Sequence, residues 1–258
     1  MAWKTLNVVD EKTKEEQNKE TFSGGNLYGS VKLVFRDVLI SEGIWDTVRV
    51  DHGTEACLML YVQDMLKDLR QNQACMPYIQ TASRKNLPAE RKWPEVNQRV
   101  VYPIKEVLVR MENGLLINRL DVLEQFCISF ITLNVVKVGL QRVMDAWNLH
   151  SIEGRNNRIP NIVANNTNRL NPVDDSLVPT ADEAVSLYSA AGGRITTDCQ
   201  FGIDPLAEDE TLVRRREQHF SRNNSSFSEI YNNVVSGNGS FLEQAILDFI
   251  SLTRHIAN

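Results

Sequence analysis

Two acidic residues in this sequence, Asp51 and Glu90, have neighbours that suit metal chemistry. Asp51 ends the β-branched stretch TVRV, and Glu90 lies in NLPAERKW, near the start of a helical pattern. In open α/β sheets, reactive side chains gather at the carboxyl ends of strands, and carboxylate oxygens suit hard cations such as Mg²⁺. The pair is therefore a candidate for metal-dependent phosphoryl transfer, in which two ions are held about 3.5–4 Å apart. The structural alternatives are a turn residue for Asp51 and a solvated first-turn acid for Glu90.

The segments around Asp51 alternate between helical and strand patterns. Apolar residues recur at helical spacing over 31–43 and again over 55–70. Between these two segments, the short stretch 47–50 has the alternating pattern of a strand. MPYIQTA, residues 76–82, is a candidate for a second strand. This order predicts a parallel or mixed sheet with helices packed on it, and it places Asp51 at the end of one strand.

The rest of the chain is predicted to be mainly helical and then loosely ordered. A long amphipathic helix is expected from Glu95 to the Asn113-Gly114 stop, followed by a more buried helical region over 119–148. After residue 155, Asn, Ser, Gly and Pro dominate, and the pattern predicts helices only at 181–190 and 240–254.

Composition narrows the class of protein. The net charge of −5 and the pI of about 5.5 provide no global basic field, so any contact with nucleic acid must be local. The four cysteines show no CxxC spacing and are expected to be reduced core thiols. The N-terminus lacks the apolar segment of a signal peptide, and the apolar run 126–136 is too short for a bilayer. We expect a soluble protein inside the cell that does not contact a membrane.

Two motifs resemble those of a known family. VRVDHGTE (48–55) resembles the second-aspartate strand of DDE integrase and transposase cores, which have a ribonuclease-H-like fold. SRKNLPAERKWPEV (83–96) is similar to their catalytic-glutamate segment, and most of all to that of animal integrase-core-domain-containing proteins. Downstream, ENGLL, DAWNLHSIEGRNNRIPN and FGID (201–204) also resemble elements of that group. The matching residues of the glutamate segment are Asn86, Glu90, Arg91, Trp93, Glu95 and Val96.

The resemblance implies a fold and a function. The expected fold is α/β: a truncated ribonuclease-H-like integrase core over 26–165, after a disordered lead-in over 1–25. A mainly helical extension ends in a low-order tail with short helices over 166–258. Intact relatives bind DNA and use Mg²⁺ for strand transfer, so Asp51 and Glu90 would be the catalytic, metal-ligating residues.

Departures from the family pattern argue against activity. The first catalytic aspartate of the family lies on an early strand, at a place that corresponds here to the residues before the predicted helix 31–43. In that stretch, Asp10 is the only acid that follows an apolar pair. Pro88 and Pro94 flank Glu90 and disturb its helix. Since two carboxylates alone should hold the ions poorly, we expect a derivative without strand-transfer activity, in which Asp51 and Glu90 are vestigial.

Basic residues near Glu90 are the candidates for phosphate contacts, although a solvated helix face explains them equally well. These candidates are Arg84, Lys85, Arg91, Lys92 and Arg99. The expected partners are DNA and a second copy of the chain. LVRRREQ (212–218) is a candidate nuclear-import signal. The alternative function is a protein–protein interaction module that kept the fold and lost DNA binding. A third alternative is an incomplete gene product that does not fold stably alone.

The matched motifs give three predictions about where residues lie. Asp51 and Glu90 should lie close together, because both would ligate the same metal centre. Trp93 and Trp147 should be largely buried, because their neighbours have helical apolar spacing. His150 should be an imidazole near a helix end rather than a functional group.

Overall fold

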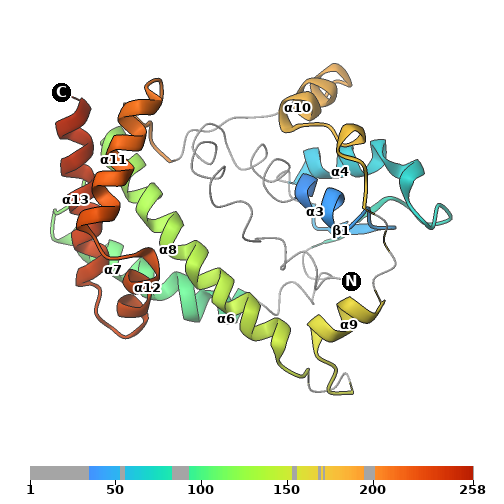
Figure 1. The fold of residues 1–258 in the computed structure, drawn as a ribbon, viewed down its shortest axis with the longest axis horizontal. Coiled ribbons are helices and arrows are strands. Elements are labelled where there is room, and N and C mark those ends of the chain that lie inside the picture. Colours follow the sequence, from blue (N-terminus) through green and yellow to red (C-terminus); the bar gives the residue numbers. More distant parts are fainter. Residues whose placement is uncertain are drawn as a thin grey trace. The chain divides into compact units, whose positions relative to one another are not determined.

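The computed structural model forms two compact units (Figure 1). It describes residues 35–52, 56–82, 93–152, 156–167, 170, 172–194 and 201–257. The described part of the first unit consists of residues up to 82 together with those from 147 to 194. The second unit consists of the described residues from 93 to 146 and from 201 onwards.

The first unit begins with the helix and strand order that the sequence predicts. Its first elements are α3 (Arg36–Ser41), β1 (Val48–Val50), α4 (Cys57–Met65), the 3₁₀ turn η4 (Lys67–Leu69) and β2 (Tyr78–Gln80). β1 and β2 are parallel, with Val48 opposite Tyr78 and Val50 opposite Gln80. The prediction of a parallel or mixed sheet joined through a helix is confirmed.

The core of the first unit is closed by residues from much later in the chain. Leu39 of α3 and Leu58 of α4 are fully buried, and Val173 and Ala184 pack into the same cluster. The Val173 N–H donates to the Leu39 carbonyl at 3.1 Å. The later elements of this unit are α9 (Pro160–Thr167), the 3₁₀ turn η7 (Asp175–Leu177) and α10 (Ala181–Ala190). A Thr180–Glu183 capping box begins α10, in agreement with the helix predicted at 181–190.

The second unit is helical. Its elements are α6 (Trp93–Val96), the π-helical turn η6 (Asn97–Val101), α7 (Tyr102–Asn113), α8 (Val122–Leu149), α11 (Glu210–Asn223), α12 (Phe227–Val235) and α13 (Ser240–Ala257). The predicted helices over 95–113, 119–148 and 240–254 are confirmed, and the last residues of α8 belong to the first unit. Aromatic side chains form the centre of the core, where Phe130 of α8 stacks on Phe249 of α13 at 4.7 Å.

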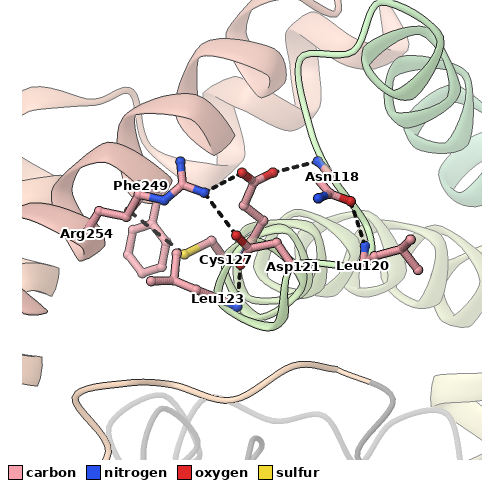
Figure 2. Close-up of polar contacts among 8 residues, drawn as sticks. Asn118, Leu120, Asp121, Leu123, Cys127, Phe249 and Arg254 are labelled. Carbon is pink, nitrogen blue, oxygen red and sulfur yellow. Dashed lines mark hydrogen bonds and ion pairs between the residues drawn. The ribbon is translucent and has the colours of Figure 1, made fainter.

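An ionic cluster connects the last helix to the start of α8 (Figure 2). Arg254 donates to Glu124 at 2.5 Å and to Asp121 at 3.2 Å. The other carboxylate oxygen of Glu124 accepts the Asn118 N–H at 2.6 Å. Asp121 also accepts the backbone N–H groups of Leu123 and Glu124 in the first turn of α8. The hydrogen bond from the Glu124 N–H is the main reason that the pKa of Asp121 lies below its usual value. The chain from 118 to 124 is thereby held against α13.

The prediction of a loosely ordered tail is wrong for residues 210–235, and the helix predicted at 240–254 belongs to the same ordered core. These segments form α11, α12 and α13, whose buried residues include Phe220, Ile230 and Ile246. The pattern did not predict α11, because the two buried positions of this helix are Arg216 and Phe220, which do not make an apolar stripe. Nor did it predict α9 or α12, although the buried Ile230, Tyr231 and Val234 of α12 have helical apolar spacing. The domain boundaries at 25/26 and 165/166 stay predictions.

By length and composition, α8 is the one helix among the described residues that could cross a membrane. Its apolar residues Phe126, Cys127 and Ile131 are nevertheless buried inside the protein. The polar residues Asn134 and Gln141 interrupt the apolar sequence of the helix. The core helix of a folded domain can be equally long and apolar, and α8 contributes its buried residues to the core of the second unit. Burial also raises the pKa of the Cys127 thiol to about 12, as expected for a core cysteine.

Candidate metal and nucleic-acid site

Asp51 directly follows β1 at the carboxyl end of the parallel strand pair. The Thr81 N–H donates to the Val50 carbonyl at 3.0 Å, so the pairing continues one residue beyond β2. Because the strands are parallel, Thr81, the residue after β2, lies level with Asp51, the residue after β1. Asp51 is half-buried and His52 is exposed. The predicted place of Asp51, at a strand end, is confirmed.

A buried arginine fixes where both strands begin, and therefore where they end. Arg70, 7% exposed, donates through Nη1 to the carbonyls of Asp46 at 2.6 Å and Cys75 at 2.8 Å. Asp46 precedes the start of β1 by two residues, and Cys75 precedes the start of β2 by three. The Thr47 hydroxyl also donates to the Met76 carbonyl at 2.7 Å, which joins the same two segments. With both starting points tied together, Asp51 and Thr81 must emerge at the same edge.

The described residues around Asp51 do not form a two-metal site by themselves. Among them, no group of three or more His, Cys, Asp or Glu side chains comes close enough to hold a metal ion. The neighbouring strand ends in Gln80 and Thr81, which bring no carboxylate to Asp51. Magnesium needs several oxygen ligands in fixed geometry, so the described set does not fit it. Glu90 lies outside the described residues, and its closeness to Asp51 stays a prediction.

Most of the predicted phosphate contacts also fall outside the described residues: Arg84, Lys85, Arg91 and Lys92. The remaining candidate, Arg99, is exposed on η6 and pairs with Glu95 at 3.2 Å, four residues earlier. Exposed Lys105 is followed at once by exposed Glu106. Along α6, η6 and α7, acids therefore accompany the basic residues, and this helix does not present a purely basic face.

The two tryptophans of the matched motifs differ from the prediction. Trp93 is 57% exposed, so its predicted burial is wrong. It is the first residue of α6, one turn before the buried positions Val96 and Val100 begin. Trp147 is half-buried and meets His150 edge-on, with ring centroids 4.8 Å apart. His150 follows the end of α8 by one residue, as the structural interpretation predicts.

The FGID motif is a packing element. Gly202 has a φ of 79°, and a Cβ there would lie 2.2 Å from the Phe126 backbone nitrogen. The Ile203 N–H donates to the Val122 carbonyl at 3.3 Å. Only glycine allows both this left-handed backbone and this close approach to α8. FGID therefore docks onto the first turn of α8.

Asp204, the last residue of FGID, holds a buried arginine that the sequence pattern would leave in solvent. The two terminal nitrogens of the Arg216 guanidinium, Nη1 and Nη2, donate to the two carboxylate oxygens of Asp204, at 2.6 and 2.7 Å. Arg216 is 1% exposed and lies between the rings of Phe126 and Phe249, at 5.1 and 4.9 Å from their centroids. LVRRREQ is therefore not a run of three exposed arginines, which removes the basis for an import signal there.

Comparison with known proteins agrees with the matched motifs. A family model for the integrase core domain matches residues 23–171, which is more than half of the chain. The chain belongs to the integrase core domain family. The match supports a ribonuclease-H-like fold, of which the described residues contain two parallel strands among many helices. No curated protein and no solved structure matches the chain.

Proposed function

We propose that this integrase-core protein binds nucleic acid and does not catalyse strand transfer. One observation carries the proposal: β1 and β2 end side by side, but only β1 ends in a carboxylate, that of Asp51. Phosphoryl transfer through two metal ions needs clustered acids that offset the ionic charge and fix the ion separation. With Glu90 as the further acid that the matched motifs offer, the site would hold ions weakly.

Nucleic-acid binding is supported by membership of the family and by the basic residues on both sides of Glu90. Arg84 and Lys85 precede it in the sequence, and Arg91 and Lys92 follow it. Because the chain as a whole is acidic, this binding should depend on local contacts and weaken steeply with salt. Intact relatives use DNA, so DNA is the first ligand to test.

The test measures binding and catalysis separately. Purified full-length protein is titrated into labelled duplex DNA, and nicking of supercoiled plasmid is measured with and without Mg²⁺. We expect salt-dependent binding, no nicking, and the same results for Asp51→Asn. Magnesium-dependent nicking that disappears in Asp51→Asn would disprove the proposed loss of activity. Absence of binding to DNA or RNA would disprove the nucleic-acid function.

A second candidate, a protein–protein interaction module, is favoured by exposed leucines. Leu115 and Leu120 are 90% and 92% exposed in the turn between α7 and α8. Highly exposed leucines in one connection can form part of an association surface. If a second copy of the chain covers them, sedimentation should show a dimer that Leu115→Ser/Leu120→Ser converts to a monomer. A monomeric wild-type protein would exclude self-association at this turn.

A further inference from the structure

α11 carries the arginine run of the sequence, and its orientation in the second unit is fixed. Asp209 caps the helix by accepting the N–H groups of Thr211 at 2.9 Å and Leu212 at 3.1 Å. Buried Arg216 and Phe220 face the core, and the Phe220 ring meets Phe249 of α13 edge-on at 5.2 Å. In Figure 1 the helix lies alongside α13. The sides of α11 that turn away from these two residues face solvent.

The exposed side of α11 carries two arginines and a histidine. Arg215, His219 and Arg222 are exposed and spaced at i, i+4 and i+7, so they lie along one line on the helix. We call these three residues the α11 stripe. Neither arginine of the stripe forms an ion pair with a described residue. The third exposed arginine, Arg214, pairs with Glu210 at 2.8 Å.

The acids of α11 are kept apart from the stripe. Glu210 and Glu217 are seven residues apart and so share the opposite flank of the helix. The negative charge of Glu210 is already offset by Arg214. Glu217 is half-buried, and this burial raises the pKa of its carboxyl group. The separation of charges on α11 contrasts with α6, η6 and α7, where acids accompany the basic residues.

We infer that the α11 stripe binds the phosphate backbone of nucleic acid. Arg215 and Arg222 are separated by about 10 Å along the helix axis, at 1.5 Å per residue. Duplex DNA carries one charge for about every 1.7 Å of its axis, so the two guanidinium groups can contact different phosphates. Arginine suits this task because its planar fork binds phosphate oxygens in pairs. The inference rests on the proposed nucleic-acid function and gives it a surface outside the region matched by the family model, residues 23–171.

The test compares the salt dependence of binding in matched variants of the full-length protein. The ligands are labelled duplex DNA, single-stranded DNA and RNA, and the dissociation constant is measured by anisotropy between about 50 and 200 mM salt. Arg215→Gln/Arg222→Gln removes two cations from the stripe. Lys105→Gln/Arg119→Gln removes two exposed cations from elsewhere in the same unit and is the matched control. Arg215→Lys/Arg222→Lys keeps the charge of the stripe.

We expect the glutamine variant of the stripe to lower the slope of log affinity against log salt by about 2 for duplex DNA, one for each lost phosphate contact. Over a fourfold rise in salt, its affinity should then fall about tenfold less than that of the wild type. The control and lysine variants should keep the wild-type slope. All variants should unfold at the same urea concentration, because the stripe does not face the core.

The possible failures are distinguishable. A wild-type protein that binds none of the three nucleic acids overturns both the proposed function and the stripe. Wild-type binding with an unchanged slope in the glutamine variant, or with an equal loss in the control, overturns the stripe alone. Binding of the wild type to anionic phospholipid vesicles in place of nucleic acid, lost in the glutamine variant, would make the stripe a membrane contact and the inference wrong.

Discussion

Each compact unit buries one arginine among its described residues, and the two arginines bind different kinds of acceptor. In the first unit, Arg70 donates to the backbone carbonyls of Asp46 and Cys75 and thereby aligns two strand starts. In the second unit, Arg216 donates to the Asp204 carboxylate and lies between two aromatic rings. Arg70 therefore ties together the starts of the two strands that lead to the candidate site, whereas Arg216 joins a docking motif to a helical core. The difference predicts unequal costs of removal, because an unpaired buried carboxylate costs more than an unpaired carbonyl.

The largest effect is expected for Arg216→Ala. It leaves the Asp204 carboxylate without a counter-ion and removes the side chain that fills the space between Phe126 and Phe249. Breaking a buried pair in this way should lower the free energy of unfolding by about 3–5 kcal/mol. Urea denaturation measures the loss. Arg215→Ala is the neighbouring control, and it should change stability by less than about 0.5 kcal/mol because Arg215 is exposed. Equal losses in the two variants would contradict the burial of Arg216.

Arg70→Ala should cost less, about 2–3 kcal/mol, because it leaves the Asp46 and Cys75 carbonyls without their donor. The same denaturation experiment measures it, with exposed Lys67→Ala as the control. Amide hydrogen exchange should also quicken at Val48 and Thr81, whose N–H groups make strand hydrogen bonds. If exchange there stays slow in Arg70→Ala, the arginine does not set the alignment of the strands.

Gly202→Ala tests the docking of FGID onto α8. Its positive φ disfavours any side chain, and the added Cβ would also clash with the α8 backbone. Gly237 has a similar φ of 86°, but a Cβ added there would meet nothing within 4 Å, so Gly237→Ala measures the backbone cost alone. We expect about 1 kcal/mol for Gly237→Ala and at least about 2 kcal/mol for Gly202→Ala. Equal losses would mean that FGID moves away from α8 without penalty.

The smallest effect is expected for Trp93→Ala. This side chain is 57% exposed, so the free energy of unfolding should change by less than about 0.5 kcal/mol. Trp45→Ala in the first unit is the contrast, since Trp45 is 8% exposed and packs against Phe35, and it should cost about 3–5 kcal/mol. A large loss of stability in Trp93→Ala would restore the packing role that the sequence predicts.

Sequence patterns predicted most of the elements whose buried residues are apolar; α12, with buried Ile230, Tyr231 and Val234, is the exception. α4, α7 and α13 have regular apolar spacing, and each was expected close to its observed position. α11 was missed because one of its two buried positions is an arginine, which a hydrophobicity pattern counts as exposed. Its Asp209 N-cap was the available local signal. Arg216 is buried by contacts with residues outside α11, and the local sequence of the helix does not reveal these contacts.

The candidate site was predictable in part. The alternation of TVRV placed Asp51 at a strand end, and the helix that follows implied a parallel neighbour. The roles of Arg70 and Arg216 were not predictable, because a sequence does not say which arginines leave solvent. The prediction that Trp93 is buried was wrong because Trp93 lies one helical turn before Val96, the first buried residue of this helix.

The hydrogen bond from Val173 to the Leu39 carbonyl has a consequence for synthesis on the ribosome. The apolar side of α3 emerges early, but Val173, Val178 and Ala184, which complete its cluster, emerge more than a hundred residues later. Until then the nascent first unit exposes Phe35 and Leu39, a state that invites association with other chains. A fragment cut at residue 171, where the family match ends, would keep that exposure permanently. Binding by nascent-chain chaperones should therefore end only after about residue 184 has left the exit tunnel.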